Sequence, residues 1–454
     1  MTEAATPGLT RRFARLTALN TASNLTVPVA GLADTVMLGR LDDVRFLAGV
    51  VLGALIFDYL YFGFAFLRMG TTGVTAQSWG RGDTGEVAAH LYRALLLAAL
   101  LGLVTVALRG PLGDLGFRLL SGTAEVEDAG RRYYDARIWG APATFANLAF
   151  VGWFLGRGEA ARALLVVAAA NVGNIVLNWW FILHLGWAAF GAGVATATAQ
   201  WLAAGIGLIL TVGAGAASCS WRTVLDRAAL RRLVALSGHL VVRTLLLITA
   251  FAVFTNASAL LGTARLAANG LILRMLSLAS YLVDGAAFAG ETLAGMAYGA
   301  GDRRELRRVL ILTVTAAEVC AVAFLLPVLI FPRGTYGLLV GYDDVVALAV
   351  DSNIWLLPVL LFAALAYAFD GFFLGLTQGK LLSRAMVISL GLGFAPLAWA
   401  AIHFRDSNLL WLSMVGMMAG RAATLGFAAR RYLLPAKLSA SRDDRGYTAG
   451  RKPT

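Results

Sequence analysis

Twelve long apolar segments follow one another along the chain, and this feature limits what the chain can fold into. Each segment is about 20 residues or longer, enough for an α-helix to cross a hydrocarbon core of about 30 Å. Lipid offers the backbone no hydrogen-bond partner, so a span is a helix or a barrel strand, and a barrel strand needs only about ten residues. We therefore predict an all-α integral membrane protein with twelve transmembrane helices, at residues 13–37, 46–74, 87–108, 133–156, 161–184, 189–213, 233–261, 266–294, 308–331, 345–374, 382–403 and 408–432.

The composition agrees with a membrane protein, because 59% of the residues are hydrophobic and only 14% are charged. A soluble chain carries about 25% charged residues. The two cysteines, Cys219 and Cys320, and the four scattered histidines have no metal-ligand spacing, so we expect no disulfide framework and no metal site. The polar start, Met1 to Thr10, leads into the first apolar segment without a small-residue cleavage site, and we expect no cleaved signal peptide.

Basic residues are distributed unevenly over the predicted loops. With a cytoplasmic N-terminus, 24 of the 38 Lys and Arg residues fall in cytoplasmic segments and nine in outside loops. Short cytoplasmic loops of membrane proteins carry an excess of Lys and Arg. We therefore predict that both termini lie in the cytoplasm and that the protein resides in the plasma (inner) membrane. Topology accounts for the net charge of +12, and we expect no nucleic-acid partner.

The second half of the chain repeats the first at an offset of about 219 residues. Gly80-Arg-Gly82-Asp83 matches Gly299-Ala-Gly301-Asp302, and Phe154-Leu-Gly156 matches Phe373-Leu-Gly375. Each repeat holds six spans, an even number, so both enter the membrane from the same side as two parallel six-helix repeats. We accordingly divide the chain into a six-helix lobe at 1–213, a cytoplasmic linker at 214–232, a second six-helix lobe at 233–434 and a disordered cytoplasmic tail at 435–454.

The repeated Gly-x-Gly-Asp segments have a structural interpretation. Glycine ends one helix, and Asp83 or Asp302 then caps the next, with Glu86 or Glu305 three residues later. We prefer this interpretation to a phosphate-binding loop, because the sequence contains no Walker motif. A transporter with this sequence would therefore not be driven by ATP.

One carboxylate, that of Asp34, lies near the end of the first apolar segment. A charged side chain at membrane depth costs roughly 2.5–3.5 kcal/mol on insertion scales, so it is by default a functional-site hypothesis. We interpret Asp34 as a cation-coupling group, with Pro28 as a hinge because proline interrupts the hydrogen-bond ladder of a helix. The alternative is a structural ion pair between Asp34 and Arg40 at the outer boundary.

The first half also concentrates uncharged polar side chains in its spans. Asn171, Asn174 and Asn178 are spaced i, i+3 and i+7, which places them on one face of the fifth helix. One interpretation is hydrogen bonding between helices, at about 0.6–2 kcal/mol for each bond. The other is a hydrogen-bond shell that responds to the protonation of Asp34. The candidate coupling and cavity residues are Asn20, Asn24, Pro28, Asn147, Asn171, Asn174, Asn178, Thr196 and Gln200.

Charged side chains recur in the spans of the second half. Asp284 and Glu291 are seven residues apart on one face of the eighth helix, whereas Arg274 is too far from Asp284 to pair within that helix. We therefore expect Arg274 to find a partner on another helix. These residues and Asp370 form either neutralising networks between helices or a second cation or substrate site. The remaining candidates for such networks are Asp58, Arg68, Arg243 and Asp351.

Several of these segments resemble the multidrug and toxic compound extrusion (MATE) family. They are Leu32-Ala-Asp34-Thr-Val-Met-Leu-Gly-Arg40, the paired Gly-x-Gly-Asp turns and the two sets of six spans. The segment from Ser280 to Glu291 is similar to the DinF branch, and Asn174-Ile-Val-Leu-Asn178 resembles the family's fifth span. The resemblance covers the chain outside its terminal tails. It implies a V-shaped antiporter of two lobes that expels cationic or amphipathic compounds in exchange for protons or sodium.

The resemblance also assigns roles to residues. Asp34 matches the protonation residue of the family's N-terminal lobe, with Asn171, Asn174 and Asn178 as its neighbours. Many members carry an acidic residue in the motif that ends at Asn178 here, so the asparagine disfavours a sodium site and favours protons as the coupling ion. No cofactor is implied apart from the coupling ion itself, H+ or Na+.

We therefore expect a secondary active efflux antiporter, not an enzyme, with alternating access through rocking of the two lobes. Its partners would be a small-molecule substrate and the lipid bilayer, and we expect a monomer. The alternative is a flippase for a lipid-linked substrate of the same wider superfamily, with a basic cavity formed by Arg68, Arg137, Arg243 and Arg274. A membrane enzyme would need a constellation such as HExxH or Ser/His/Asp, which the sequence does not contain.

Overall fold

The computed structural model describes residues 8–120, 122–215 and 219–433. Within these ranges the chain is helical, with short 3-10 and π segments and no β-strand. The predicted tail at 435–454 lies outside the described residues. The first half comprises α1 (Leu9–Leu38), α2 (Val44–Gly63), α3 (Phe66–Gly80), α4 (Thr84–Ala107), α5 (Arg109–Leu119), α6 (Ala124–Arg137), η1 (Ile138–Gly140), α7 (Ala141–Gly156), α8 (Ala160–Asn178), η2 (Trp179–His184) and α9 (Ala188–Gly213). The rest comprises α10 (Trp221–Val224), α11 (Arg227–Leu260), α12 (Thr263–Ala300), α13 (Arg303–Ile330), α14 (Pro332–Gly337), α15 (Asp343–Ser352), η3 (Asn353–Trp355), α16 (Leu356–Gly375), α17 (Gly379–Ile388), η4 (Ser389–Phe394), α18 (Ala395–Phe404) and α19 (Ser407–Leu433).

The predicted spans correspond to single helices or to helices that continue one another. Among the described residues, eleven helical stretches are long and apolar enough to cross a membrane, the first at Val44–Gly80 and the last at Ser407–Leu433. The remaining predicted span is α1, which has 30 residues but is more polar, because Asn20, Asn24 and Asp34 interrupt its apolar sequence. The all-α membrane fold predicted from the sequence is confirmed.

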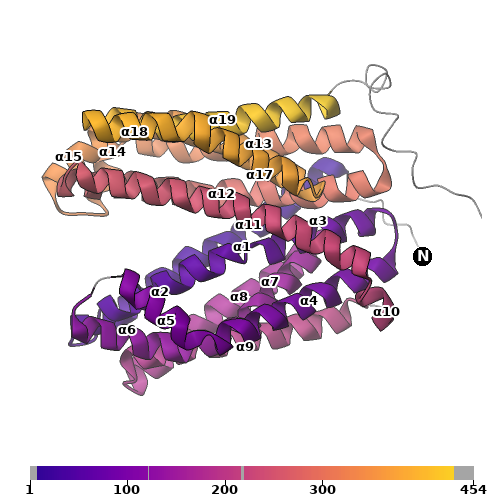
Figure 1. Ribbon diagram of the computed structural model, residues 1–454, viewed down its shortest axis with the longest axis horizontal. Coiled ribbons are helices and arrows are strands. Elements are labelled where there is room, and N and C mark those ends of the chain that lie inside the picture. Colours follow the sequence, from indigo (N-terminus) through magenta and orange to yellow (C-terminus); the bar gives the residue numbers. More distant parts are fainter. Residues whose placement is uncertain (1–7, 121, 216–218, 434–454) are drawn as a thin grey trace, which may run out of the picture.

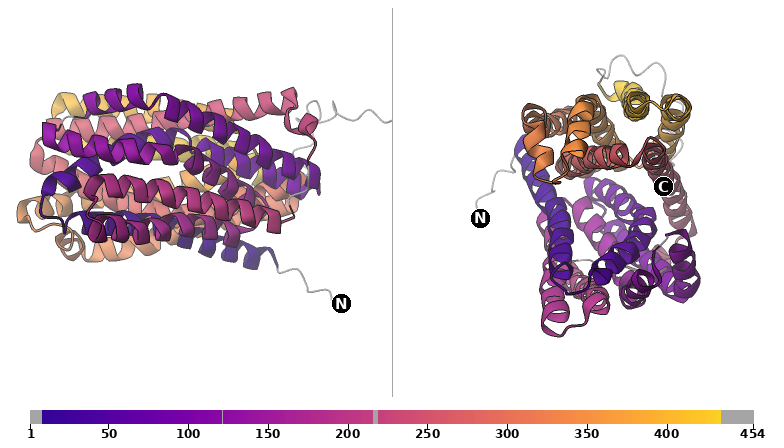
Figure 2. Two further views of the ribbon diagram at one scale, coloured as in Figure 1. Left: turned by 90° about the horizontal axis from the view of Figure 1, so that it is seen from below. Right: turned by 90° about the vertical axis from the view of Figure 1, so that its left-hand side faces the viewer.

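The helices form two bundles that run along the long axis of the molecule (Figure 1). Helices α1–α9 lie on one side and α12–α19 on the other. The bundles are close together at the end that carries the start of α1 and α10, and they diverge toward the end that carries α6 and α15. Figure 2 separates the same two groups in an end-on view, and the start of the chain runs from one group to the other along an edge.

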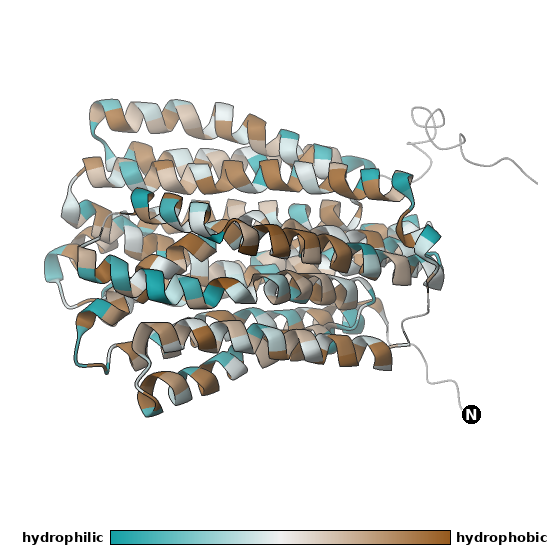
Figure 3. Ribbon diagram, turned by 60° about the horizontal axis from the view of Figure 1, so that its bottom comes forward, coloured by the Kyte–Doolittle hydropathy of each residue, from teal (hydrophilic) through white to brown (hydrophobic). Residues whose placement is uncertain are grey.

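Apolar residues occupy most of the length of the helices, and many polar residues gather at helix ends and turns (Figure 3). Large apolar side chains such as Ile209 and Leu392 are 71% and 78% exposed on the protein surface. Such exposure is unfavourable in water but favourable against lipid tails, so these faces are suited to the bilayer.

The segment between the halves is partly helical. We predicted a linker at 214–232, yet α11 already begins at Arg227. Asp226 caps this helix by accepting hydrogen bonds from two backbone N–H groups of its first turn, so the polar start continues as helix beyond the apolar span. Arg93 of α4 donates to two backbone oxygens of α10 and so holds the linker against the first half.

Equivalent glycines give the two halves the same internal packing. Gly152 and Gly156 of α7 lie against backbone oxygens of α3. Gly371 and Gly375 of α16, 219 residues later, lie against backbone oxygens of α12. A Cβ at any of these positions would lie less than 3.0 Å from the facing oxygen, so only glycine allows the helices to approach this closely.

The same symmetry relates the halves to each other where α3 crosses α12. Gly80 of α3 lies against the backbone of Met296, and its counterpart Gly299 of α12 lies against the backbone of Gln77. Residues 77 and 296 are themselves 219 positions apart. The two halves therefore meet backbone to backbone at equivalent positions, and we name this contact the inter-half crossing.

The two Gly-x-Gly-Asp segments form the predicted helix caps. The Oδ1 of Asp83 accepts a hydrogen bond from the N–H of Glu86 at 2.9 Å, and Asp302 accepts one from the N–H of Glu305 at 2.8 Å. Gly82 and Gly301 have φ angles of +74° and +72°, a left-handed conformation that glycine adopts at little cost. The structural interpretation of these segments is confirmed.

Candidate functional site

Helix α1 is attached to both halves of the molecule. The side-chain amides of Asn20 and Asn24 donate to backbone oxygens of α12, at 3.5 and 3.2 Å. From Thr26 onward, the polar contacts of α1 are made with α8, and they include one from Asp34. Pro28 lies close to the point where the contacts change from α12 to α8, within a helix that is continuous from Leu9 to Leu38.

A chain of hydrogen bonds runs from Asp34 across α8 to α9. The Nδ2 of Asn178 donates to Oδ1 of Asp34 at 2.5 Å and to Oδ1 of Asn174 at 3.2 Å. Asn174 donates in turn to Oγ1 of Thr196 in α9, at 2.9 Å. Asn174 and Asn178 are buried, whereas Asp34 is half-buried. Asp34 is therefore connected to α8 by one hydrogen bond and to α9 through the asparagines of α8.

Arg137 supplies a positive charge beside this chain. It donates to the hydroxyl of Tyr133 at 2.5 Å, and its guanidinium lies 4.4 Å from the centre of the Phe57 ring. It interacts electrostatically with both Asp34 and Asp58. Sequence reasoning counted Arg137 among the arginines of a possible basic cavity and missed its closeness to Asp34. The four-residue spacing between Tyr133 and Arg137 on one helix could have indicated their contact, but nothing in the sequence indicates that Arg137 lies near Asp34.

The other candidates of the first half lie apart from Asp34. Asn171 donates to Oγ1 of Thr26 at 2.6 Å and joins α8 to α1. Asn147 of α7 donates to the side chain of Gln200 in α9 at 2.8 Å, and this pair has no hydrogen bond to the Asp34 chain. The structure thus brings Asn174, Asn178 and Thr196 together with Asp34, and it separates Asn20, Asn24, Asn147 and Gln200 from it.

The alternative ion pair between Asp34 and Arg40 does not form. Within the described part of the chain, Arg40 has no carboxylate oxygen within 4.0 Å, and its side chain is exposed. Asp34 faces Asn178 instead.

Charged residues of the second half pair across helices. Arg68 of α3 donates to Glu291 of α12 at 3.3 Å, an ion pair that joins the two halves next to the inter-half crossing. Asp370 of α16 accepts hydrogen bonds from both Arg243 of α11 and Arg421 of α19. These side chains are almost completely buried; the charges of Arg68 and Glu291 balance, while the single carboxylate of Asp370 is shared by two arginines. This arrangement supports the first of the two interpretations for Glu291 and Asp370.

Asp284 and Arg274 do not follow this pattern. Asp284 interacts electrostatically with three buried arginines but forms no ion pair within 4.0 Å among the described residues. We expected Arg274 to pair with a residue on another helix, and this expectation is wrong. Among the described residues no carboxylate oxygen lies within 4.0 Å of Arg274, and the side chain of Arg274 is exposed. The reason is that Asp370 is bound by two other arginines, while Asp351 faces Arg265 at 3.9 Å.

Sequence comparisons agree with this architecture. The sequence model of the MatE family matches residues 21–180 and again 240–400, two stretches that begin 219 residues apart. The chain is 32% identical over 420 residues to DNA damage-inducible protein F of Escherichia coli (strain K12), and the match covers 90% of each chain.

Comparisons of structure give the same fold. A crystal structure of MATE in the bent conformation matches with a TM-score of 0.87 and 19% identity, covering 96% of this chain and 98% of that chain. A multidrug resistance MATE family transporter of the MOP superfamily, in an outward-facing conformation, matches with a TM-score of 0.86 and 19% identity, covering 94% and 96%. Because the family's sequence model matches most of the chain and a relative of 32% identity spans 90% of it, the chain belongs to the MatE family of multidrug and toxic compound extrusion transporters, which are multi-pass membrane proteins and not enzymes.

Proposed function

We propose that this protein is a secondary active efflux antiporter that exports cationic or amphipathic compounds in exchange for protons, with Asp34 as the coupling carboxylate. Membership of a multidrug efflux family supports the class of transport and a small-molecule substrate. The hydrogen-bond chain from Asp34 through Asn178 to Thr196 is the observation that supports the coupling role.

The contact between Asp34 and Asn178 depends on charge. An ionised carboxylate accepts the hydrogen bond from the amide strongly, because charge-assisted hydrogen bonds are about twice as strong as neutral ones. A protonated carboxyl carries a donor on one oxygen and is a weaker acceptor. Protonation of Asp34 therefore weakens the link between α1 and α8, and loss of the proton restores it.

Helix α1 couples this change in hydrogen bonding at Asp34 to a movement of the two halves. Its first part stays with α12 through Asn20 and Asn24, whereas its last part is held to α8 through Asp34. Pro28 has no N–H for the carbonyl of Asn24, so α1 bends there without breaking a helical hydrogen bond. We take the two halves as lobes at 1–213 and 233–434. Proton binding at Asp34 thus shifts the equilibrium between two arrangements of these lobes, and this shift is the basis of alternating access.

Protons are favoured over sodium by the groups around Asp34. A hard cation such as sodium requires several oxygen ligands. The group in contact with Asp34 is an N–H donor of Asn178, and Arg137 adds a positive charge nearby. Neither an N–H donor nor a guanidinium coordinates a cation.

The test is efflux of a fluorescent organic cation from proteoliposomes under an imposed pH gradient or an imposed sodium gradient. We expect the pH gradient to drive transport by the wild type and Asp34→Asn to abolish the gradient-dependent part. Asp42→Asn, the same chemical change at an exposed position eight residues later, serves as the matched control and should keep full activity.

Three results would count against the proposal. Full pH-driven transport by Asp34→Asn would make Asp34 structural and move the coupling role to Asp284. Transport driven by sodium but not by the pH gradient would identify the wrong coupling ion. Absence of cation transport under both gradients would favour the flippase, although two of the arginines on which that alternative depends are already engaged by carboxylates. Arg68 pairs with Glu291, and Arg243 shares Asp370 with Arg421.

We also propose that the protein is a monomer in the plasma (inner) membrane, with both termini in the cytoplasm. Cys219 in the linker is an inside reporter once Cys320 is replaced, and Gly341→Cys, between α14 and α15, is an outside reporter. A membrane-impermeant maleimide added to intact cells should label the cysteine at 341 and spare Cys219. Labelling of Cys219 alone would show that the topology is the reverse of the one proposed.

A further inference from the structure

A large cavity lies between the beginning of α1 and the turn that joins α7 to α8. Its volume is about 1010 Å³. At this end α1 packs against α12, where the guanidinium of Arg12 contacts the sulfur of Met296. The start of α1 is thereby held away from α8, and the cavity lies between the two helices. Arg15 in the cavity is 19 residues from Asp34 on one continuous helix, a separation of about 28 Å. The cavity is therefore distinct from the site at Asp34.

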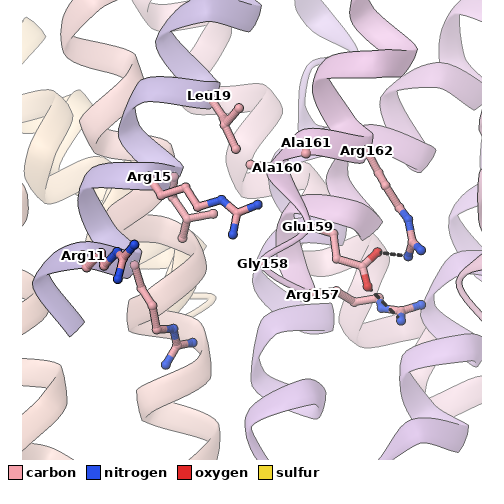
Figure 4. A pocket seen from close by; sticks show the side chains of 11 residues that line it. Arg11, Arg15, Leu19, Arg157, Gly158, Glu159, Ala160, Ala161 and Arg162 are labelled. Carbon is pink, nitrogen blue, oxygen red and sulfur yellow. Dashed lines mark hydrogen bonds and ion pairs between the residues drawn. The ribbon is translucent and has the colours of Figure 1, made fainter. Parts of the chain in front are cut away.

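The cavity carries an excess of positive charge. Its only carboxylate among the lining residues is that of Glu159, which pairs with Arg157 at 3.0 Å and with Arg162 at 2.6 Å (Figure 4). The three arginines that α1 contributes have no carboxylate within 4.0 Å in the described part of the chain. The arginines that line the cavity are Arg11, Arg12, Arg15, Arg157 and Arg162.

Polar and apolar groups follow each other along the wall that α1 forms. Arg11, Arg15 and Leu19 are four residues apart and share one face of the helix. Figure 4 shows Arg15 reaching into the space between α1 and α8, with Leu19 one turn farther along near Ala160. The cavity thus has a cationic end next to the helix terminus and an apolar end toward the middle of the molecule.

The opposite wall is also suited to an anion. It is formed by Gly158 and the first turn of α8, and the side chain of Glu159 makes no capping hydrogen bond to that turn. Free N–H groups and the helix dipole make such a terminus attractive to anions.

Arg157 is the buried cation of this wall. It lies between the spans, and its side chain is 9% exposed. Its guanidinium lies over the rings of Trp79 and Trp153 and donates to the backbone oxygen of Ala214 at 3.1 Å, whereas its Nε has no hydrogen-bond partner. Burial lowers the pKa of Arg157, an effect that the charge of Glu159 opposes and that of Arg162 reinforces. A bound anion would add a second opposing charge.

We propose that this cavity binds a phosphate-bearing anion, with the guanidinium groups of Arg11 and Arg15 on the phosphate. Arginine is matched to this ligand, because its planar guanidinium donates two parallel hydrogen bonds to phosphate oxygens. The cavity is far larger than a phosphate ion and has an apolar end at Leu19, which favours an anionic phospholipid as the source. Such a lipid would bridge α1 and α8 at the end where the protein itself leaves them apart.

The test measures the thermal stability of the full-length protein in detergent during titration with short-chain phosphatidylglycerol, phosphatidylcholine or inorganic phosphate. We expect phosphatidylglycerol to raise the unfolding temperature saturably and phosphatidylcholine to leave it unchanged. The double variant Arg11→Gln/Arg15→Gln should bind phosphatidylglycerol about thirtyfold more weakly, given the usual contribution of a basic residue to binding anionic lipid. The matched control is Arg307→Gln/Arg308→Gln, which removes two exposed charges at the start of α13 and should bind as the wild type does.

A second variant tests the cavity without removing an arginine. Ala161→Glu adds a carboxylate to the lining from an exposed position, where it does not disturb the fold, and should also weaken the binding of phosphatidylglycerol. If inorganic phosphate alone reproduces the full stabilisation, the anion site stands and its ligand is free phosphate. Equal weakening in both double variants, an equal response to the two lipids, or wild-type binding by Ala161→Glu would overturn the proposal.

Discussion

Two asparagines of the first half, Asn147 and Asn178, are buried in neighbouring helices and differ in what they contact. Asn178 donates to Asp34, whereas Asn147 donates to Gln200 and reaches no charged group. The sequence identifies both as polar residues within spans, and the family resemblance made Asn178 one of three expected neighbours of Asp34. The contact itself depends on which way α7 and α8 face, which residue types alone do not determine. Asp34 itself was predictable, since a carboxylate in an apolar segment is costly wherever it points.

The first prediction compares these two asparagines. Asn178→Leu should abolish most of the pH-driven transport while Asp34 remains in place, because the carboxylate loses its link to α8. Asn147→Leu removes a hydrogen bond between helices worth about 0.6–2 kcal/mol and should lower stability slightly without uncoupling transport. Both are measured in proteoliposomes beside the wild type. Equal uncoupling by the two variants would refute a specific role for Asn178.

Asp370 forms two buried ion pairs in the second half. Its carboxylate is shared by Arg243 and Arg421, both buried. Removal of one member of a buried ion pair typically costs about 3–5 kcal/mol, because a charge is left buried without a partner.

Asp370→Asn should therefore lower the unfolding temperature in detergent strongly, by several degrees. Asp351→Asn is the matched control: its side chain is 77% exposed and its pair with Arg265 is long, so we expect almost no change. The triple variant Asp370→Asn/Arg243→Met/Arg421→Met should recover part of the loss. An unchanged unfolding temperature for Asp370→Asn would show that the network does not stabilise the fold.

At the scale of elements, the spans follow from the sequence closely, because hydrophobicity and the backbone's need for hydrogen bonds leave no other solution in lipid. The breaks within spans are less predictable. The 3-10 segments η1 and η3 occupy equivalent places before Pro142 and Pro358, and their equivalence is visible in the repeat. The π segment η2 at the end of α8 carries no such signal, since it adapts the backbone to its neighbours.

Glycine determines how closely α3 and α12 approach, and this leads to a prediction at the same scale. Gly80→Ala should lower the unfolding temperature and the transport rate, because the added Cβ would overlap the backbone of Met296. Gly270→Ala, in an open position of α12, should leave stability unchanged or raise it slightly, since alanine favours helix by about 1 kcal/mol over glycine. Equal stability of the two variants would contradict the close contact.

At the scale of the whole molecule, the halves touch at one end and diverge at the other (Figure 1). Gln77 of α3 spans the closed end, where its Nε2 donates to the backbone oxygen of Gly375 at 2.9 Å and to Oγ1 of Thr377 at 3.2 Å. Arg68 and Glu291 join the halves deeper inside. Under the alternating access proposed above, these contacts have to open during transport.

This arrangement predicts that a covalent link at the closed end stops transport. Gln77→Cys/Thr377→Cys, with Cys219 and Cys320 replaced by serine, should lose efflux after treatment with a short bifunctional thiosulfonate and regain it after reduction. The two single-cysteine variants, treated alike, should stay active. Undiminished efflux in the cross-linked protein would mean that transport does not need the halves to separate here.

The sequence by itself determined the membrane fold, the approximate places of the spans and the twofold repeat, and it singled out Asp34 as a candidate, because each follows from the cost of polar groups in lipid or from residues in direct succession. Only the tertiary structure decided which asparagine meets Asp34, that Arg137 lies beside it, and that Asp370 binds two arginines rather than Arg274. These contacts join residues more than 50 positions apart. They depend on how each helix is rotated and tilted against its neighbours, which is set by packing over its whole length.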